Sequence, residues 1–154
     1  YSRVGEQRSI PITGSRAKRI VHGALNIYTG DLALLITHHW DQYSHRAFLK
    51  MVRSQWRGWA IVLIQDRGAP HKAVASQSYA AQIGIEVRWL PRATPELNAM
   101  DHLWRHSKAV TLANCPIRSI DASAMAFCEY LIALSPTERL CQAGALSEDF
   151  WLAR

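Results

Sequence analysis

The chain has 154 residues, which is the size of one domain. Hydrophobic residues make up 49% of it and charged residues 19%, a composition that excludes an intrinsically disordered chain. Lys and Arg outnumber Asp and Glu by 18 to 12, and the net charge of +6 favours an anionic partner such as nucleic acid. No apolar run approaches the roughly 18 residues of a membrane helix, and no signal peptide is apparent. We therefore expect a cytoplasmic protein.

Strands and helices alternate along the chain after a basic, turn-rich first segment. The apolar pattern predicts strands at 19–29, 32–38, 59–65 and 85–90, and helices at 42–56, 72–83, 94–113, 119–134 and 137–142. Gly30-Asp31 joins the first two strands in a hairpin, and Thr94 is expected as the N-cap of its helix. The strand 59–65 is continuously apolar up to its end, which is typical of burial on both faces. This order predicts one α/β domain over 1–154, a mixed sheet flanked by helices.

Two acidic residues occur where such a fold places a site. Asp66 follows the strand 59–65 directly, and ligand crevices lie beyond the carboxyl ends of strands in open α/β sheets. Asp101 lies in the helix 94–113 and shares a face with Arg105 and Lys108. Each acid alone has an ordinary explanation, Asp66 as a turn or N-cap residue and Asp101 as an ion-pair partner of Arg105. Together, with 34 residues between them, they are candidates for a pair of converging carboxylates.

Several motifs surround these two acids. They are His22-Gly23-Ala24-Leu25-Asn26 with Thr29-Gly30, Gln65-Asp66-Arg67-Gly68-Ala69-Pro70-His71, Trp89-Leu90-Pro91, Pro95-Glu96-Leu97-Asn98, Asp101-His102-Leu103-Trp104-Arg105 with Lys108, and Phe150-Trp151-Leu152. In these motifs the sequence resembles the DDE catalytic domain of bacterial insertion-sequence transposases related to the mariner superfamily. The spacing between Asp66 and Asp101 is also that of the family's second and third catalytic acids.

The resemblance implies a ribonuclease H-like fold in which three carboxylates hold two Mg²⁺ or Mn²⁺ ions. Asp66 and Asp101 match two of these catalytic and metal-binding carboxylates, which suit hard cations and converge from separate elements. The implied activity is DNA transposition, by cleavage of DNA at the element ends and transfer of the freed 3′-hydroxyl to target DNA. The implied partners are DNA and, in a homo-oligomer, a further transposase chain; no membrane is implied.

Five further residues are candidates for lining this site or contacting DNA: His71, Asn98, Arg67, Arg105 and Lys108. His71 follows Asp66 by five residues, and an ordinary loop histidine is an equally good interpretation. Asn98 precedes Asp101 by about one helical turn. Basic side chains close to the acids suit the phosphates of DNA.

The family's first catalytic acid lies in a strand before the hairpin, and no residue of this chain matches it. Glu6 lies in the basic segment after the expected strand and Asp31 in the hairpin turn, so neither is a convincing substitute. Since that strand is also the centre of the family's sheet, we expect a partial catalytic domain that lacks its first strand and is inactive alone. A separate DNA-binding domain is not expected in it. The start at Tyr1, with the first methionine at Met51, agrees with a piece of a longer protein.

Two other functions are compatible with the sequence. A non-catalytic transposase remnant would only bind DNA or pair with the full-length protein. A zinc hydrolase would use His102 and His106, which have the i, i+4 spacing of metal ligands. Leu103 occupies the position of that motif's catalytic Glu, however, and the sequence offers no third ligand.

Overall fold

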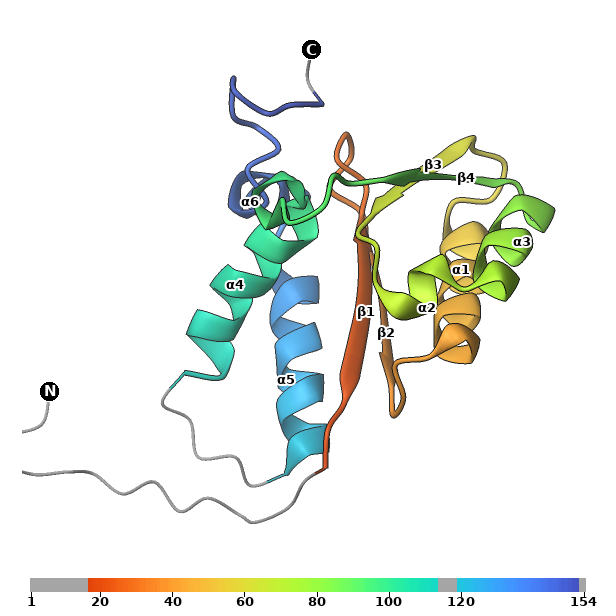
Figure 1. Cartoon of the computed structure of the whole chain (residues 1–154). Helices are drawn as coiled ribbons and strands as arrows, with labels where there is room; N and C mark the ends of the chain where they lie inside the picture. Colours follow the sequence, from red (N-terminus) through yellow and green to blue (C-terminus); the bar gives the residue numbers. More distant parts are fainter. Residues whose placement is uncertain (1–16, 114–118, 153–154) are drawn as a thin grey trace, which may run out of the picture.

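The computed structural model describes residues 17–113 and 119–152, and Glu6 lies outside these ranges. Figure 1 shows the arrangement of its elements. They are β1 (Ile20–Leu25), β2 (Leu32–Thr37), α1 (Gln42–Gln55), β3 (Ile61–Gln65), α2 (Ala69–Lys72), α3 (Val74–Gln82), β4 (Ile85–Trp89), the 3-10 turn η1 (Pro95–Leu97), α4 (Ala99–Thr111), α5 (Ile120–Ala133) and α6 (Pro136–Gln142). The α/β order predicted from the sequence is confirmed.

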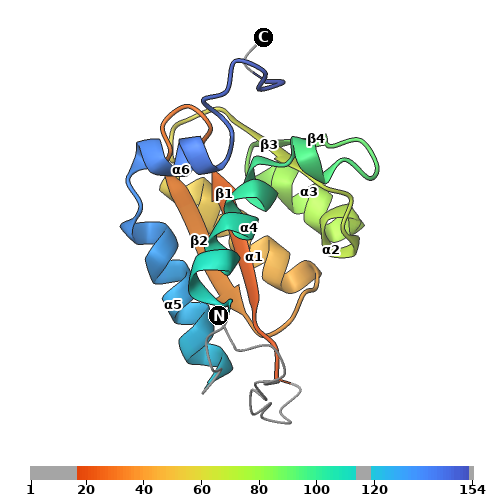
Figure 2. The same cartoon turned by 90° about the vertical axis from the view of Figure 1, so that its left-hand side faces the viewer.

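β1 and β2 form an antiparallel hairpin that is covered by helices on both faces (Figures 1 and 2). The ring of His22 stacks on Phe48 of α1, whereas a Cβ at Gly23 would meet Trp104 of α4, so successive β1 residues face opposite helices. Each face has its own hydrophobic core. The buried members are Ala24, Ala33, Phe48, Leu49, Val52, Ala80 and Ile85 beside α1, and Met100, Leu103, Phe127, Cys128 and Leu131 beside α4 and α5.

β3 and β4 form a parallel pair with Ile61 opposite Ile85 and Gln65 opposite Trp89. A parallel pair needs a crossover connection, which α2 and α3 provide. The sequence predicts a single helix at 72–83. The structure has two, because Ala73 adopts an extended backbone conformation (φ −55°, ψ 130°) between them.

The two strand pairs do not join into one sheet within the described residues. The prediction that the strand 59–65 is buried on both faces is wrong. Val62 is 47% exposed, and Gln65 is the one buried residue of β3. The physical reason is that Ile61 and Leu63 pack against the core beside α1, whereas Val62, on the opposite face of the strand, is left uncovered by the described residues.

The helix predicted over 94–113 also begins differently. Thr94 makes no capping bond, and residues Pro95–Leu97 form a 3-10 turn. The α-helix begins at Ala99, because the Asn98 side chain accepts the backbone N–H of Met100 at 3.1 Å and caps it. Asp101 therefore lies in the first turn of α4 rather than two turns into it.

The C-terminal helices pack against the hairpin. Arg139 of α6 donates to the backbone oxygens of Leu131 and Ile132, at the end of α5, and to that of Gly30 in the hairpin turn. Gly30 has a φ of +76°, and a Cβ there would lie 2.4 Å from the backbone oxygen of Pro136. None of the helices in the described ranges is long and apolar enough to cross a membrane.

Candidate active site

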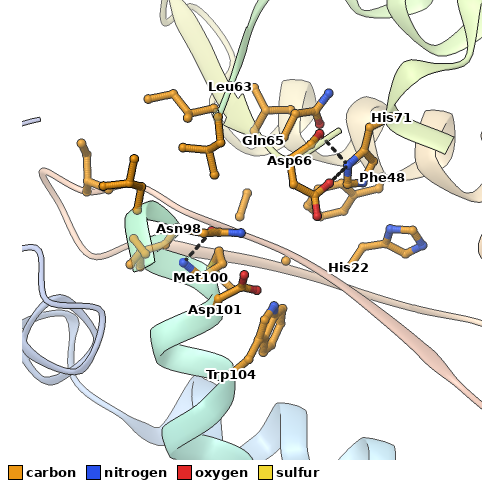
Figure 3. A pocket seen from close by; sticks show the side chains of 18 of the residues that line it. His22, Phe48, Leu63, Gln65, Asp66, His71, Asn98, Met100, Asp101 and Trp104 are labelled. Carbon is orange, nitrogen blue, oxygen red and sulfur yellow. Dashed lines mark hydrogen bonds and ion pairs between the residues drawn. The ribbon is translucent and has the colours of Figure 1, made fainter. Parts of the chain in front are cut away.

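A hollow of about 300 Å³ lies between β1 and β3, and we call it the strand hollow. Consecutive residues of both strands line it, 20–25 of β1 and 62–65 of β3. Because neighbouring residues of a strand point to opposite faces, such a lining means that the open edges of the two strands bound the hollow. Side chains of α1 and α4 and the segment 150–152 complete its walls. Asp66 and Asp101 both line it (Figure 3).

Asp66 is the residue that follows β3, and the next loop fixes its carboxylate. Its Oδ1 accepts the backbone N–H of Gly68 at 2.9 Å and lies 2.7 Å from Nδ1 of His71. The short helix α2 begins after Gly68 and carries His71 back toward Asp66 (Figure 3). Asp66 Oδ2 makes no hydrogen bond within the described residues. This oxygen is therefore free to bind a cation or a substrate group.

Asp101 enters the same space from the first turn of α4, and its side chain points toward the gap that Asp66 faces (Figure 3). Burial raises the pKa of Asp101 above its usual value, and the charge of Asp66 adds to this effect. Asn98, Lys108 and His102 oppose the rise. A carboxyl group whose ionised form is disfavoured by burial and by a neighbouring carboxylate is a candidate functional group.

A second hollow of about 290 Å³ has Asp66 and Asp101 in its wall as well, and we call it the loop hollow. The loop 90–94 between β4 and η1 forms most of it, together with Pro95, Arg67 and Asn98. The two acids thus lie where two hollows meet. One hollow is bounded by strand edges and the other by a loop.

A histidine that the sequence pattern does not single out, His45, lies close to His71 and Asp66. His45 of α1 is 2% exposed, and its ring centroid lies 4.5 Å from that of His71 and 6.5 Å from that of His22. Burial, together with the nearby His71 and His22, lowers the pKa of His45 to about 3. Neither ring nitrogen of His45 has a hydrogen-bond partner in the described part of the chain. A buried imidazole without partners is costly, so this position needs a polar neighbour.

Two tryptophans also differ from the sequence-based expectation. The apolar pattern favours Trp40 and Trp59 as core residues, but they are 49% and 64% exposed. Trp40 lies in the loop before α1 and meets the ring of His71 edge-on at 6.3 Å. It therefore lines the strand hollow next to Asp66 instead of filling a core.

Two of the remaining candidates, Arg105 and Lys108, lie on α4. Arg105 and Lys108 are exposed on this helix and line neither hollow, whereas Arg67 lines the loop hollow and Asn98 lines both. A ring nitrogen of His102 lies 2.9 Å from the backbone oxygen of Glu96, and the ring of His106 stacks near Tyr130. Within the described residues no group of three His, Cys, Asp or Glu side chains is placed to hold a metal ion. The carboxylates of Asp66 and Asp101 remain the pair of hard oxygen donors at the junction of the hollows.

Solved structures with this arrangement identify the fold. The chain is similar to the Mos1 transposase catalytic domain solved with raltegravir and Mg (TM-score 0.60, 16% identity, 77% of this chain and 64% of that one). It is also similar to the Mos1 transposase paired-end complex with the left transposon end (TM-score 0.70, 14% identity, 97% and 47%) and to the Mos1 mariner paired-end complex with Mn (TM-score 0.65, 15% identity, 97% and 47%). The fold is therefore that of a transposase catalytic domain of ribonuclease H-like type, and the chain spans about half the length of the Mos1 chains in the paired-end complexes.

The family follows from the sequence itself. Residues 1–122 match the family described as "DDE superfamily endonuclease", and the chain belongs to that family. No curated protein matches the sequence significantly.

Proposed function

We propose that this chain is part of the catalytic domain of a DNA transposase, a metal-dependent enzyme that cleaves DNA and transfers strands. The observation that carries the proposal is the convergence of Asp66, from the end of β3, and Asp101, from the start of α4, on one space. Membership of the DDE superfamily endonucleases supports the same activity. DNA is the substrate, and the net charge of +6 suits its phosphates.

Asp66 and Asp101 are the residues that would hold Mg²⁺ or Mn²⁺. Carboxylate oxygens are the ligands that these cations prefer, and a cation would relieve the repulsion that raises the pKa of Asp101. Two such ions, when bound, supply an activated water for the attack and stabilise the leaving oxygen. His71 holds Asp66 in place by its 2.7 Å contact, and Arg67, Asn98, Arg105 and Lys108 bind or orient the DNA. The Mos1 relatives named above were solved with Mg and with Mn.

The third carboxylate comes, in this proposal, from a strand that is not among the described residues. Three observations support this: the strand hollow is bounded by two open strand edges, Val62 is exposed on one of them, and the buried His45 lacks a partner among the described residues. A strand in the hollow would pair with β1 and β3 and cover Val62. Asp31 does not replace its carboxylate, because Asp31 lies in the hairpin turn with its side chain bonded to Thr29.

The wider assignment follows from the same resemblance. We infer an insertion-sequence transposase of bacterial origin, related to the mariner group, that works in the cytoplasm and pairs with a further transposase chain. The similarity to paired-end complexes of Mos1 supports pairing on DNA ends. The residues 1–154 form a partial catalytic domain in this proposal. A non-catalytic remnant that only binds DNA is the competing function.

The test is a DNA cleavage assay with Mn²⁺ on DNA that carries the element end. Two proteins are compared: the 154-residue chain and a longer protein that includes the upstream strand. The longer protein is expected to cut at the element boundary and the 154-residue chain to leave the DNA intact. If the longer protein binds this DNA without cutting it, the remnant is the correct function. Clean cutting by the 154-residue chain would show that an acid within it, Glu6 first, completes the site.

A further inference from the structure

The loop hollow has a lining that suits one nucleotide. Leu90, Pro91 and Pro95 are apolar lining residues, and Arg67 and Arg92 are basic ones. Its volume of about 290 Å³ is just below the range for small-molecule sites, about 300 to 1,000 Å³, and too small for a duplex. Asp66 and Asp101 form the wall where this hollow meets the strand hollow. A group bound here would therefore lie directly beside the proposed metal-binding carboxylates.

The two arginines of the loop hollow are available to an anion. Arg67 donates a long bond of 3.4 Å from Nε to the backbone oxygen of Leu90, and Arg92 makes no hydrogen bond in the described part of the chain. Neither forms an ion pair there, whereas the neighbouring Arg88 is paired with Glu86 at 2.7 Å. Exposed arginines without a carboxylate partner match phosphate well, because the planar guanidinium binds two oxygens at once.

The loop itself is held in place before any ligand binds. At its start, the N–H of Leu90 donates to the backbone oxygen of Gln65 at 3.0 Å, which ties the loop to the strand end that carries Asp66. In its middle, Thr94 Oγ1 donates to the Pro91 oxygen at 3.0 Å, and Ala93 adopts a left-handed φ of 55°. Such strained conformations persist where the surroundings fix them, and they concentrate at functional sites. Arg92 is therefore presented at a defined place relative to Asp66.

We propose that the loop hollow binds one unpaired nucleotide of the DNA strand next to the bond that is cut. Arg67 and Arg92 bind its phosphate, and the proline surface contacts its sugar and base. This inference rests on the proposed function, since the ligand is a nucleotide of the DNA substrate. It also assigns the two hollows different occupants. DNA enters the site through the loop hollow, and the strand hollow is filled by the additional protein strand proposed above.

The experiment measures the binding of a short single-stranded oligonucleotide to the 154-residue chain without metal, across a range of salt concentrations. Arg92→Gln and Arg67→Gln are compared with Arg57→Gln, which removes the same charge before the start of β3, at the strand end opposite Asp66. We expect about tenfold weaker binding for each loop variant, which corresponds to one charge-assisted hydrogen bond fewer. The slope of log affinity against log salt should become shallower by about 0.7 for each phosphate that is no longer neutralised. Arg57→Gln should stay within about twofold of the parent.

The outcomes separate this inference from the proposed function. Failure of the parent chain, and of the longer protein, to bind DNA overturns the proposed function itself. If Arg92→Gln and Arg67→Gln weaken DNA binding no more than Arg57→Gln does, the loop-hollow site is wrong and the proposed function stands. Inorganic phosphate is the second probe. If it competes as well as the oligonucleotide at equal concentration, the hollow is a free-phosphate site and the nucleotide assignment is wrong.

Discussion

Nδ1 of His71 lies 2.7 Å from Oδ1 of Asp66, the same oxygen that accepts the backbone N–H of Gly68. One carboxylate oxygen is thus held by two groups of the loop, while Oδ2 makes no hydrogen bond in the described part of the chain. Hydrogen-bond partners of this kind orient a metal-binding carboxylate and increase its affinity for the metal. His71 is therefore a positioning residue for Asp66.

The first prediction concerns this contact. His71→Ala should lower Mn²⁺ affinity and DNA cleavage by the longer protein by about 10- to 100-fold, the usual effect of removing such a partner. His71→Asn keeps a side-chain N–H near the position of Nδ1 and should retain part of the Mn²⁺ affinity and part of the cleavage activity. The measurements are calorimetric titration with Mn²⁺ and the cleavage rate. His39→Ala, at an exposed histidine of the loop before α1, is the control. Equal metal affinity in His71→Ala and the parent would contradict the role.

The second prediction concerns the stability of the metal-free chain. Because burial and Asp66 raise the pKa of Asp101, its ionised form is disfavoured in the folded state. At pH values above the folded-state pKa of Asp101, its negative charge therefore destabilises the fold. This destabilisation disappears as the pH falls below that pKa and the carboxylate is protonated. Asp101→Asn should raise the midpoint of urea unfolding at neutral pH, and the gain should shrink in acid. A lower midpoint at neutral pH would contradict the repulsion between Asp101 and Asp66.

The third prediction concerns His45. Its folded pKa of about 3 is below the ordinary histidine value of 6.5, so between these values the unfolded chain binds a proton that the folded chain does not. Stability should therefore fall as the pH falls through this window, by up to about 1.4 kcal/mol per pH unit. His45→Phe should remove this contribution and raise stability, because it also removes two ring nitrogens that have no partner among the described residues. Urea unfolding as a function of pH measures both effects. An unchanged pH dependence in His45→Phe would show that His45 is not buried and neutral.

The fourth prediction compares two glycines. Gly30 and Gly144 have φ values of +76° and +74°, but a Cβ at Gly30 would lie 2.4 Å from the Pro136 oxygen whereas a Cβ at Gly144 has open space. Gly144→Ala should cost about 1 to 2 kcal/mol for the left-handed conformation alone. Gly30→Ala should cost a further 1 to 3 kcal/mol, roughly the cost of overpacking. If chemical unfolding shows the same loss of unfolding free energy for both variants, α6 does not pack closely against the hairpin turn.

The sequence predicts the order of the elements well, because hydrophobic periodicity and turn residues act locally. Asp66 stands out by its place after an apolar strand, and the loop that follows fixes its carboxylate. The start of α4 is mispredicted, because Thr94 and Asn98 are both good N-caps and their side-chain bonds decide between them. Local sequence does not determine that choice.

Other features of the site depend on tertiary structure. His45 lies in a segment whose sequence is polar. Only the tertiary contacts with His71 and His22 place it beside the site as a buried group. Trp40 fits an apolar pattern, yet the loop carries it to the rim of the strand hollow. Val62 is likewise exposed because the described residues cover only the opposite face of β3, which periodicity does not reveal.

The central claim is that Asp66 and Asp101 act together in DNA cleavage. The direct measurement is Mn²⁺-dependent cleavage of element-end DNA by the longer protein carrying Asp66→Asn, Asp101→Asn or, as a matched control, Asp31→Asn in the hairpin turn. The two site variants should bind this DNA at least as well as the parent, because each removes a negative charge, and should cut none of it. Asp31→Asn should cut like the parent. Cutting by either Asp66→Asn or Asp101→Asn would contradict the assignment of that acid.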